Sequence, residues 1–169
     1  MRLQRLFRHL IAPSWVARQA FPAEALEAIE AAVKSVERHH AGELRFVVES
    51  GLPLGLLLRD ISARQRAIDV FAQLRVWDTE QNNGVLVYLQ LIDRRVEIVA
   101  DRGINAKVAQ SHWEAICRDM EVTFRVGAYG RGALQAIESI GSLLAEHFPA
   151  AQESDAAAAN ELPDRPVLL

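Results

Sequence analysis

Oxygen-bearing side chains gather in two short stretches of this sequence, and oxygen is the ligand that a hard cation prefers. Residues 78–84 read DTEQNNG, which places carboxylates and amides close together. Residues 101–103 read DRG and add a further carboxylate. Calcium takes about six to eight oxygen ligands, usually from several loops, and magnesium accepts similar groups. The candidate metal ligands are Asp78, Glu80, Asn82, Asn83, Asp101 and Glu43.

Two predicted strands flank these stretches. Residues 85–92 read VLVYLQLI, a run without charge that is apolar apart from Gln90, which is typical of a strand buried on both faces. A polar turn at Asp93 and Arg94 follows, and apolar residues then alternate through residues 95–100. This pattern predicts a second strand that pairs with the first as a hairpin.

A third strand is predicted earlier, at residues 44–49, before a helix that leads into the 78–84 loop. A strand, a helix and a further strand of one sheet normally form a right-handed parallel crossover. We therefore expect Glu43, the 78–84 loop and Asp101 to meet at one edge of the sheet. The opposite edge is expected to collect Glu49, Ser50, Asp93 and Arg94.

These residues also have simpler explanations. Asp, Asn and Gly are ordinary turn residues, because Asx side chains bond their own backbone, and the DxDxDG spacing of an EF-hand is absent. Arg102 is a candidate for attracting an anion such as phosphate, or it pairs with Asp101 or Glu43. His39 and His40 can ligate zinc, but neighbours on a helix point about 100° apart. A favourable interaction with the helix dipole is the better explanation of that pair.

Amphipathic helices are predicted on both sides of the strands. One runs from residue 22 to 40, one opens at a capping box over residues 111–114, and the last covers residues 129–147. With the strands they predict an α/β fold over residues 21–149, namely an α/β/α sandwich with a small mixed β-sheet flanked by helices. Residues 150–169 are alanine-rich, proline-bearing and without periodicity, which predicts a disordered tail.

Residues 1–20 predict a basic amphipathic helix with an apolar stripe and a cationic side. The stripe consists of Leu3, Leu6, Phe7 and Leu10, and the arginines are Arg2, Arg5 and Arg8. The simpler interpretation is an extra helix docked on the domain. The alternative is a contact with an anionic membrane or a partner protein.

Composition narrows the class of protein. Half of the 169 residues are hydrophobic, which suits one globular domain, and the net charge of -3 argues against a nucleic-acid binder. Cys117 is the only cysteine, so no intramolecular disulfide forms.

No run approaches the roughly 18 apolar residues of a membrane span, and Arg8, His9 and Pro13 interrupt the apolar core that a signal peptide would need. A cytoplasmic location is therefore expected. The GxSxG elbow and the P-loop of nucleophilic and nucleotide enzymes are also absent.

The central stretch carries a family resemblance. An aromatic Trp77, then NNGVL, an apolar strand, a DR turn and VEIV before Gly103 resemble the TPM domain. The sequence GELRF at residues 42–46 is similar to the opening strand of that family. The resemblance covers about two thirds of the chain and implies an α/β sandwich. Relatives carry adjacent acids before the Asn-Gly, where this chain has Gln81 and Asn82, so its loop is less charged.

The family implies a function without defining one. Its members include thylakoid-lumen proteins linked to photosystem repair, membrane-tethered auxiliary proteins and many bacterial proteins, and divalent-cation binding and a weak acid phosphatase activity have been proposed for some. The expectation is therefore a soluble TPM-like binding or accessory module, with calcium or magnesium at the acidic edge, acting with a membrane-associated or sister protein. The alternative is a metal-dependent acid phosphatase-like hydrolase that uses the same edge with Arg102 on the phosphate. A third alternative is a purely structural domain recruited through its basic N-terminal helix.

Overall fold

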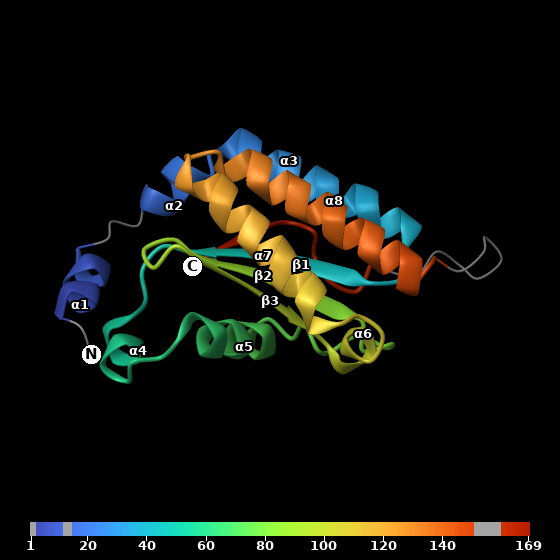
Figure 1. Cartoon of the computed structure of the whole chain (residues 1–169), viewed down its shortest axis with the longest axis horizontal. Coiled ribbons are helices and arrows are strands. Elements are labelled where there is room, and N and C mark those ends of the chain that lie inside the picture. Colours follow the sequence, from blue (N-terminus) through green and yellow to red (C-terminus); the bar gives the residue numbers. More distant parts are fainter. Residues whose placement is uncertain (1–2, 12–14, 151–159) are drawn as a thin grey trace.

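The computed structural model describes residues 3–11, 15–150 and 160–169. A four-stranded sheet has the order β3-β2-β1-β4, and helices cover both of its faces (Figure 1). The strands are β1 (Glu43–Glu49), β2 (Gly84–Gln90), β3 (Arg95–Ala100) and β4 (Val167–Leu168). β1 runs parallel to β2 and to β4, and β2 is antiparallel to β3. The predicted mixed sheet and its parallel crossover are therefore confirmed.

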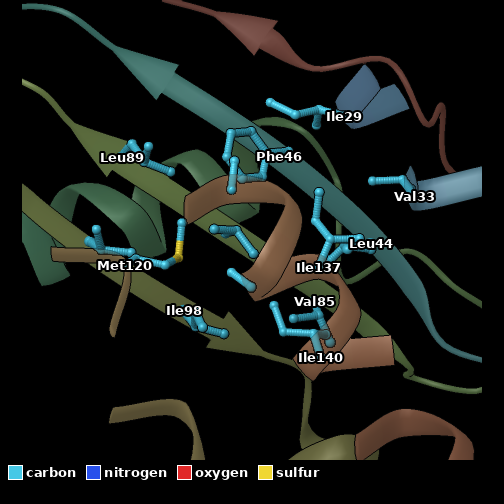
Figure 2. Close-up of a cluster of buried hydrophobic side chains, with 14 of the residues drawn as sticks. Ile29, Val33, Leu44, Phe46, Val85, Leu89, Ile98, Met120, Ile137 and Ile140 are labelled. Carbon is cyan, nitrogen blue, oxygen red and sulfur yellow. The ribbon is translucent and has the colours of Figure 1, made fainter. Parts of the chain in front are cut away.

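One face of the sheet is covered by α3 (Ala23–Val36), α7 (Gln110–Arg125) and α8 (Tyr129–His147). The main core lies between them and the sheet, where Phe46, Val85 and Leu89 meet apolar helix residues such as Ile137 (Figure 2). α5 (Ala63–Gln73) covers the other face, against Leu86 and Tyr88. All seven residues of β2 are buried, as the uncharged and largely apolar run predicted. None of the described helices is long and apolar enough to cross a membrane.

Short helices connect these layers: α2 (Trp15–Ala20), η1 (Glu37–His39), α4 (Leu54–Leu58) and α6 (Arg102–Asn105). Ser62 caps α5, because its hydroxyl accepts a hydrogen bond of 3.1 Å from the Gln65 backbone N–H. The capping box predicted at residues 111–114 is wrong. α7 starts one residue earlier, at Gln110, and its N-cap Ala109 makes no side-chain cap bond.

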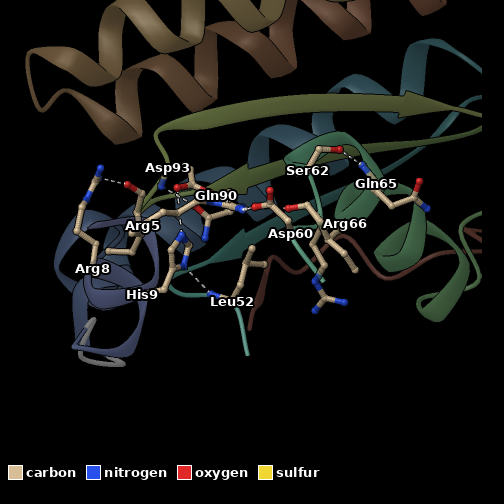
Figure 3. Close-up of polar contacts among 12 residues, drawn as sticks. Arg5, Arg8, His9, Leu52, Asp60, Ser62, Gln65, Arg66, Gln90 and Asp93 are labelled. Carbon is tan, nitrogen blue, oxygen red and sulfur yellow. Dashed lines mark hydrogen bonds and ion pairs between the residues drawn. The ribbon is translucent and has the colours of Figure 1, made fainter. Parts of the chain in front are cut away.

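The N-terminal segment differs from the single helix expected over residues 1–20. Its described part forms two helices, α1 (Leu3–Leu10) and α2, and residues 1–2 and 12–14 lie outside the described residues. α1 also docks by the opposite side from the expected one. Arg5 and the buried His9 point toward Asp93 in the β2–β3 turn (Figure 3), while Leu3 and Phe7 are exposed.

The C-terminal segment differs from the disordered tail expected over residues 150–169. Residues 151–159 lie outside the described residues, but residues 160–169 pack along β1, and β4 adds a fourth strand there. Leu162 is buried, and the Leu169 backbone N–H donates to the Val48 carbonyl at 2.9 Å. The backbone groups of an edge strand need partners, and this segment supplies them to β1.

Candidate functional site

The three segments expected to share one edge of the sheet do meet there. Glu43 is paired with Gly84 across β1 and β2, and Val85 is paired with Ala100 across β2 and β3. Backbone hydrogen bonds continue this contact beyond the strands. The Glu43 N–H donates to the Asn83 carbonyl at 3.1 Å, and the Asp101 N–H donates to the Gly84 carbonyl at 2.8 Å. We call this region the polar edge, defined by residues 40–43, 78–84 and 101–103.

Two glycines make the close packing of the polar edge possible. A Cβ atom on Gly84 would lie 1.9 Å from the Val76 carbonyl oxygen, and one on Gly103 would lie 2.5 Å from that of Asn82. Neither distance can accommodate a side chain. The 78–84 loop is therefore pressed directly against the start of α6, and Asn82 adopts a positive φ of 53° within it.

Two of the predicted ligands, the buried Asn83 and the half-buried Asp101, are held in place by this packing. Asn83 is 3% exposed, and its side-chain amide donates to the Ala41 carbonyl. Asp101 caps α6, because Oδ1 accepts from the Arg102 N–H at 2.6 Å. The other oxygen of each side chain, Asn83 Oδ1 and Asp101 Oδ2, is buried and has no hydrogen-bond partner in the described part of the chain. Such atoms are rare in folded proteins and require an explanation.

His40 lies beside them and is held neutral. Its Nδ1 accepts a hydrogen bond of 3.1 Å from the Gly42 N–H, so the proton of the neutral ring sits on Nε2. Burial lowers the pKa of His40 from 6.5 to about 4. The neighbouring His39 is exposed and points to the Ser35 carbonyl. The two histidines therefore do not present a joint pair of zinc ligands.

The remaining predicted acids do not converge on Asn83 and Asp101. Asp78 is exposed and lies 4.0 Å from Arg75, and Glu80 is also exposed. Glu43 is buried, but its Oε2 accepts a hydrogen bond of 3.1 Å from the Leu162 N–H. Among the residues that the structure describes, no three His, Cys, Asp or Glu side chains are placed to hold a metal ion together.

Arg102, the candidate anion ligand, is tied to the loop itself. Its Nε donates to Asn82 Oδ1 at 2.9 Å. Asn82 is thus occupied as a hydrogen-bond acceptor for the arginine. The contact keeps the guanidinium beside the polar edge.

The sequence analysis missed the contribution of the C-terminal segment to this edge. Glu161 accepts a hydrogen bond of 3.0 Å from the Glu80 N–H. Burial, together with the nearby carboxylates of Glu43 and Asp164, raises the pKa of Glu37 to about 8. Burial likewise raises the pKa of Glu43, with Glu161 and Asp164 adding to the effect. The only sequence signal for this docking was the short apolar run at residues 167–169.

Comparisons with known proteins agree with this architecture. The BA42 protein of the psychrophilic bacterium Bizionia argentinensis, solved by NMR, is 30% identical, with 88% of this chain and 95% of that chain covered and a TM-score of 0.76. The N-terminal domain of a protein from P. gingivalis, also solved by NMR, is 19% identical, with 88% of this chain and 96% of that chain covered and a TM-score of 0.59; at this identity it shows the fold alone. No curated protein matches the chain. The sequence model of the TPM domain matches residues 17–143, which is most of the chain, and the chain therefore belongs to the TPM domain family.

Proposed function

We propose that this chain is a TPM binding or accessory module that takes a hard divalent cation, calcium or magnesium, at the polar edge and acts with a membrane-associated or sister protein. The observation that carries the proposal is the pair of buried oxygens without partners, Asn83 Oδ1 and Asp101 Oδ2. An unsatisfied buried acceptor costs about 1–3 kcal/mol. A bound cation would offset that cost at both atoms.

Buried carboxyl groups lie beside the polar edge. Burial raises the pKa of Glu37 to about 8 and also raises that of Glu43, and the neighbouring carboxylate of Asp164 acts in the same direction on both. A cation bound beside these groups would oppose the shifts and favour their charged forms. The neutral His40 carries its proton on Nε2 and does not compete as a cation.

The number of charged ligands determines the cation affinity that we expect. Because the described acids do not converge, Asp101 would be the main carboxylate ligand, and amide and backbone oxygens of the 78–84 loop would supply the rest. Calcium affinity rises with the number of charged ligands. We therefore expect weak binding, with calcium favoured over zinc because the ligands are oxygens.

Thermal unfolding of chelator-stripped protein tests the proposal, with calcium, magnesium, manganese or zinc added separately. An ion at about 100 times its Kd stabilises a protein by about 2.7 kcal/mol. For a domain of this size that corresponds to a rise of roughly 5–10 °C in Tm. Asp101→Asn should remove the rise while keeping the cap of α6, because asparagine caps helices as well as aspartate does.

Asp119→Asn is the matched control, since Asp119 is exposed on α7 and away from the polar edge. It should retain the full rise. If no ion raises the Tm of the unmodified chain, or if Asp101→Asn keeps the rise, the cation proposal fails.

The phosphatase alternative is supported by one observation, the position of Arg102 beside the polar edge through its bond to Asn82. A metal-dependent phosphatase would bind phosphate near its cation. Hydrolysis of para-nitrophenyl phosphate with the stabilising ion present tests it. Turnover that is lost in both Asp101→Asn and Arg102→Gln, with both variants folded, would support the enzyme. Stabilisation by a cation without any turnover would contradict the phosphatase alternative and support the binding module.

A further inference from the structure

The helix α1 is attached to the domain by its polar side. Arg5 Nε donates to Asp93 Oδ2 at 3.0 Å, and Arg5 Nη1 lies 3.2 Å from Asp60 Oδ1 (Figure 3). The buried His9 accepts a hydrogen bond of 2.9 Å from the Leu52 N–H and places Nε2 3.1 Å from Asp93 Oδ1. These contacts fix the rotation of the helix about its axis.

The same rotation turns the apolar side of α1 outward. Leu3 is 83% exposed, Phe7 64% and Leu10 55%, and Ile11 just after the helix is 60% exposed. An amphipathic helix that only covers a domain would bury this side and expose its charges. Exposed apolar patches of this kind usually mark a contact surface.

The neighbouring helix α4 extends the exposed surface. α1 packs against α4, and both lie at one end of the molecule, apart from the main helical layers (Figure 1). Leu54 and Leu58 of α4 are 48% and 61% exposed. We call this surface the apolar end; it consists of Leu3, Phe7, Leu10, Ile11, Leu54 and Leu58.

Charge identifies the kind of partner. The first 23 residues contain four arginines and no aspartate or glutamate, although the whole chain has a net charge of -3. Exposed arginines also stand next to the apolar end: Arg59 directly follows α4, Arg94 follows Asp93, and Arg8 lies on α1, where its guanidinium donates to the Ile92 carbonyl. Leucine and phenylalanine flanked by arginine match the boundary of an anionic bilayer, where side chains enter the acyl region and cations meet the headgroups.

We propose that the apolar end is a peripheral membrane-binding surface that inserts Leu3, Phe7 and Leu10 into the interface of an anionic lipid bilayer. α1 protrudes at the end of the molecule, which suits a flat surface. The ion pairs to Asp93 keep it oriented before contact, so the helix need not form on the lipid. Membrane binding is independent of cation binding at the polar edge. Its test is carried out with a chelator present, so that either proposal can fail without affecting the other.

Flotation of the full chain with lipid vesicles tests the proposal. Vesicles of phosphatidylcholine alone are compared with vesicles containing about one quarter phosphatidylglycerol, at low and high salt. We expect capture by the anionic vesicles, weakened by salt because surface charges are screened. Leu3→Gln/Phe7→Gln/Leu10→Gln should reduce capture by roughly tenfold or more.

The control carries the same chemical change elsewhere. Ile68→Gln/Val122→Gln alters two apolar side chains that are 42% and 59% exposed on α5 and α7, and it should bind the vesicles like the unmodified chain. No capture by anionic vesicles at low salt would overturn the proposal, as would equal capture of the triple variant. Sedimentation of the free chain provides a second check. A dimer that the triple variant abolishes would assign the apolar end to a second copy of this chain and overturn the membrane assignment.

Discussion

The buried ion pair between Glu49 and Arg66 is where one substitution should have its largest effect on stability. Arg66 is 8% exposed and Glu49 is 2% exposed. The guanidinium donates twice, from Nε to Oε2 at 2.9 Å and from Nη2 to Oε1 at 2.8 Å. The hydroxyl of the fully buried Tyr88 donates to the same carboxylate at 2.5 Å. The hydrogen bonds to Glu49 raise the pKa of Arg66, which keeps the guanidinium charged.

Arg66→Met removes the hydrogen bonds from the guanidinium to Glu49 and leaves the buried carboxylate with the Tyr88 hydroxyl as its side-chain donor. Breaking a buried pair by removing one partner costs about 3–5 kcal/mol. A domain of this size loses about 2–4 °C per kcal/mol, so Tm should fall by roughly 6–20 °C. Urea unfolding at pH 7, followed by circular dichroism, measures the free energy directly.

Two further variants separate charge from packing. Arg95→Met makes the same change in an arginine that is 63% exposed and 3.9 Å from Glu121, and it should cost no more than about 1 kcal/mol. Glu49→Leu/Arg66→Met/Tyr88→Phe removes all three polar groups and should recover most of the loss, because an apolar replacement of a buried pair is often neutral. A loss from Arg66→Met as small as that from Arg95→Met would refute the reasoning. A triple variant as unstable as the single one would show that packing, not the unpaired charge, is responsible.

Three other predictions concern stability against pH and the C-terminal segment. Because the pKa of His40 is lowered, its contribution to the free energy of unfolding is complete above pH 6.5 and is lost as pH falls toward about 4, by up to about 3 kcal/mol. His40→Gln should therefore reduce the loss of stability over this pH range, as measured by urea unfolding. The raised pKa of Glu37 has the opposite effect: its contribution to the free energy of unfolding is complete below pH 4.5 and is lost as pH rises through about 8, by up to about 5 kcal/mol. Glu37→Gln should therefore make the chain more stable at pH 8. An unchanged dependence of stability on pH in either variant would contradict the assignment. Deleting residues 160–169 removes β4 and the buried Leu162 and should cost about 2–4 kcal/mol, whereas a truly disordered tail would cost nothing.

The sheet could be predicted from the sequence because its signals are local and strong. The run at residues 85–92 contains no charged side chain, and the hairpin turn follows at once. The crossover rule then placed Glu43, Asn83 and Asp101 at one edge, which the strand pairing confirms. The direction of the strands therefore gave the location of the polar edge without any side-chain information.

The errors arose where the deciding partner is distant in sequence. α1 is oriented by Asp93, which lies 88 residues from Arg5, so its own stripe suggested the opposite docking. The segment at residues 160–169 has no periodicity, and its order comes from β1, about 120 residues earlier. The spread of Asp78, Glu80 and Glu43 away from Asp101 depends on individual hydrogen bonds that topology does not determine.

The two proposed surfaces lie at opposite ends of the sheet, and this separation has a measurable consequence. Asp93 follows β2 at the apolar end, whereas Asn83 precedes β2 at the polar edge. Seven residues of strand span about 20 Å, while the field of an anionic bilayer decays over about 8 Å at physiological salt. The membrane should therefore not enrich cations at the polar edge, and cation affinity should be the same with and without bound anionic vesicles. Calorimetric titration of the vesicle-bound and free chain measures both affinities. A clear increase on vesicles would mean either that the polar edge itself faces the lipid or that α1 and the polar edge are coupled through the sheet, and retention of the increase at high salt would favour coupling.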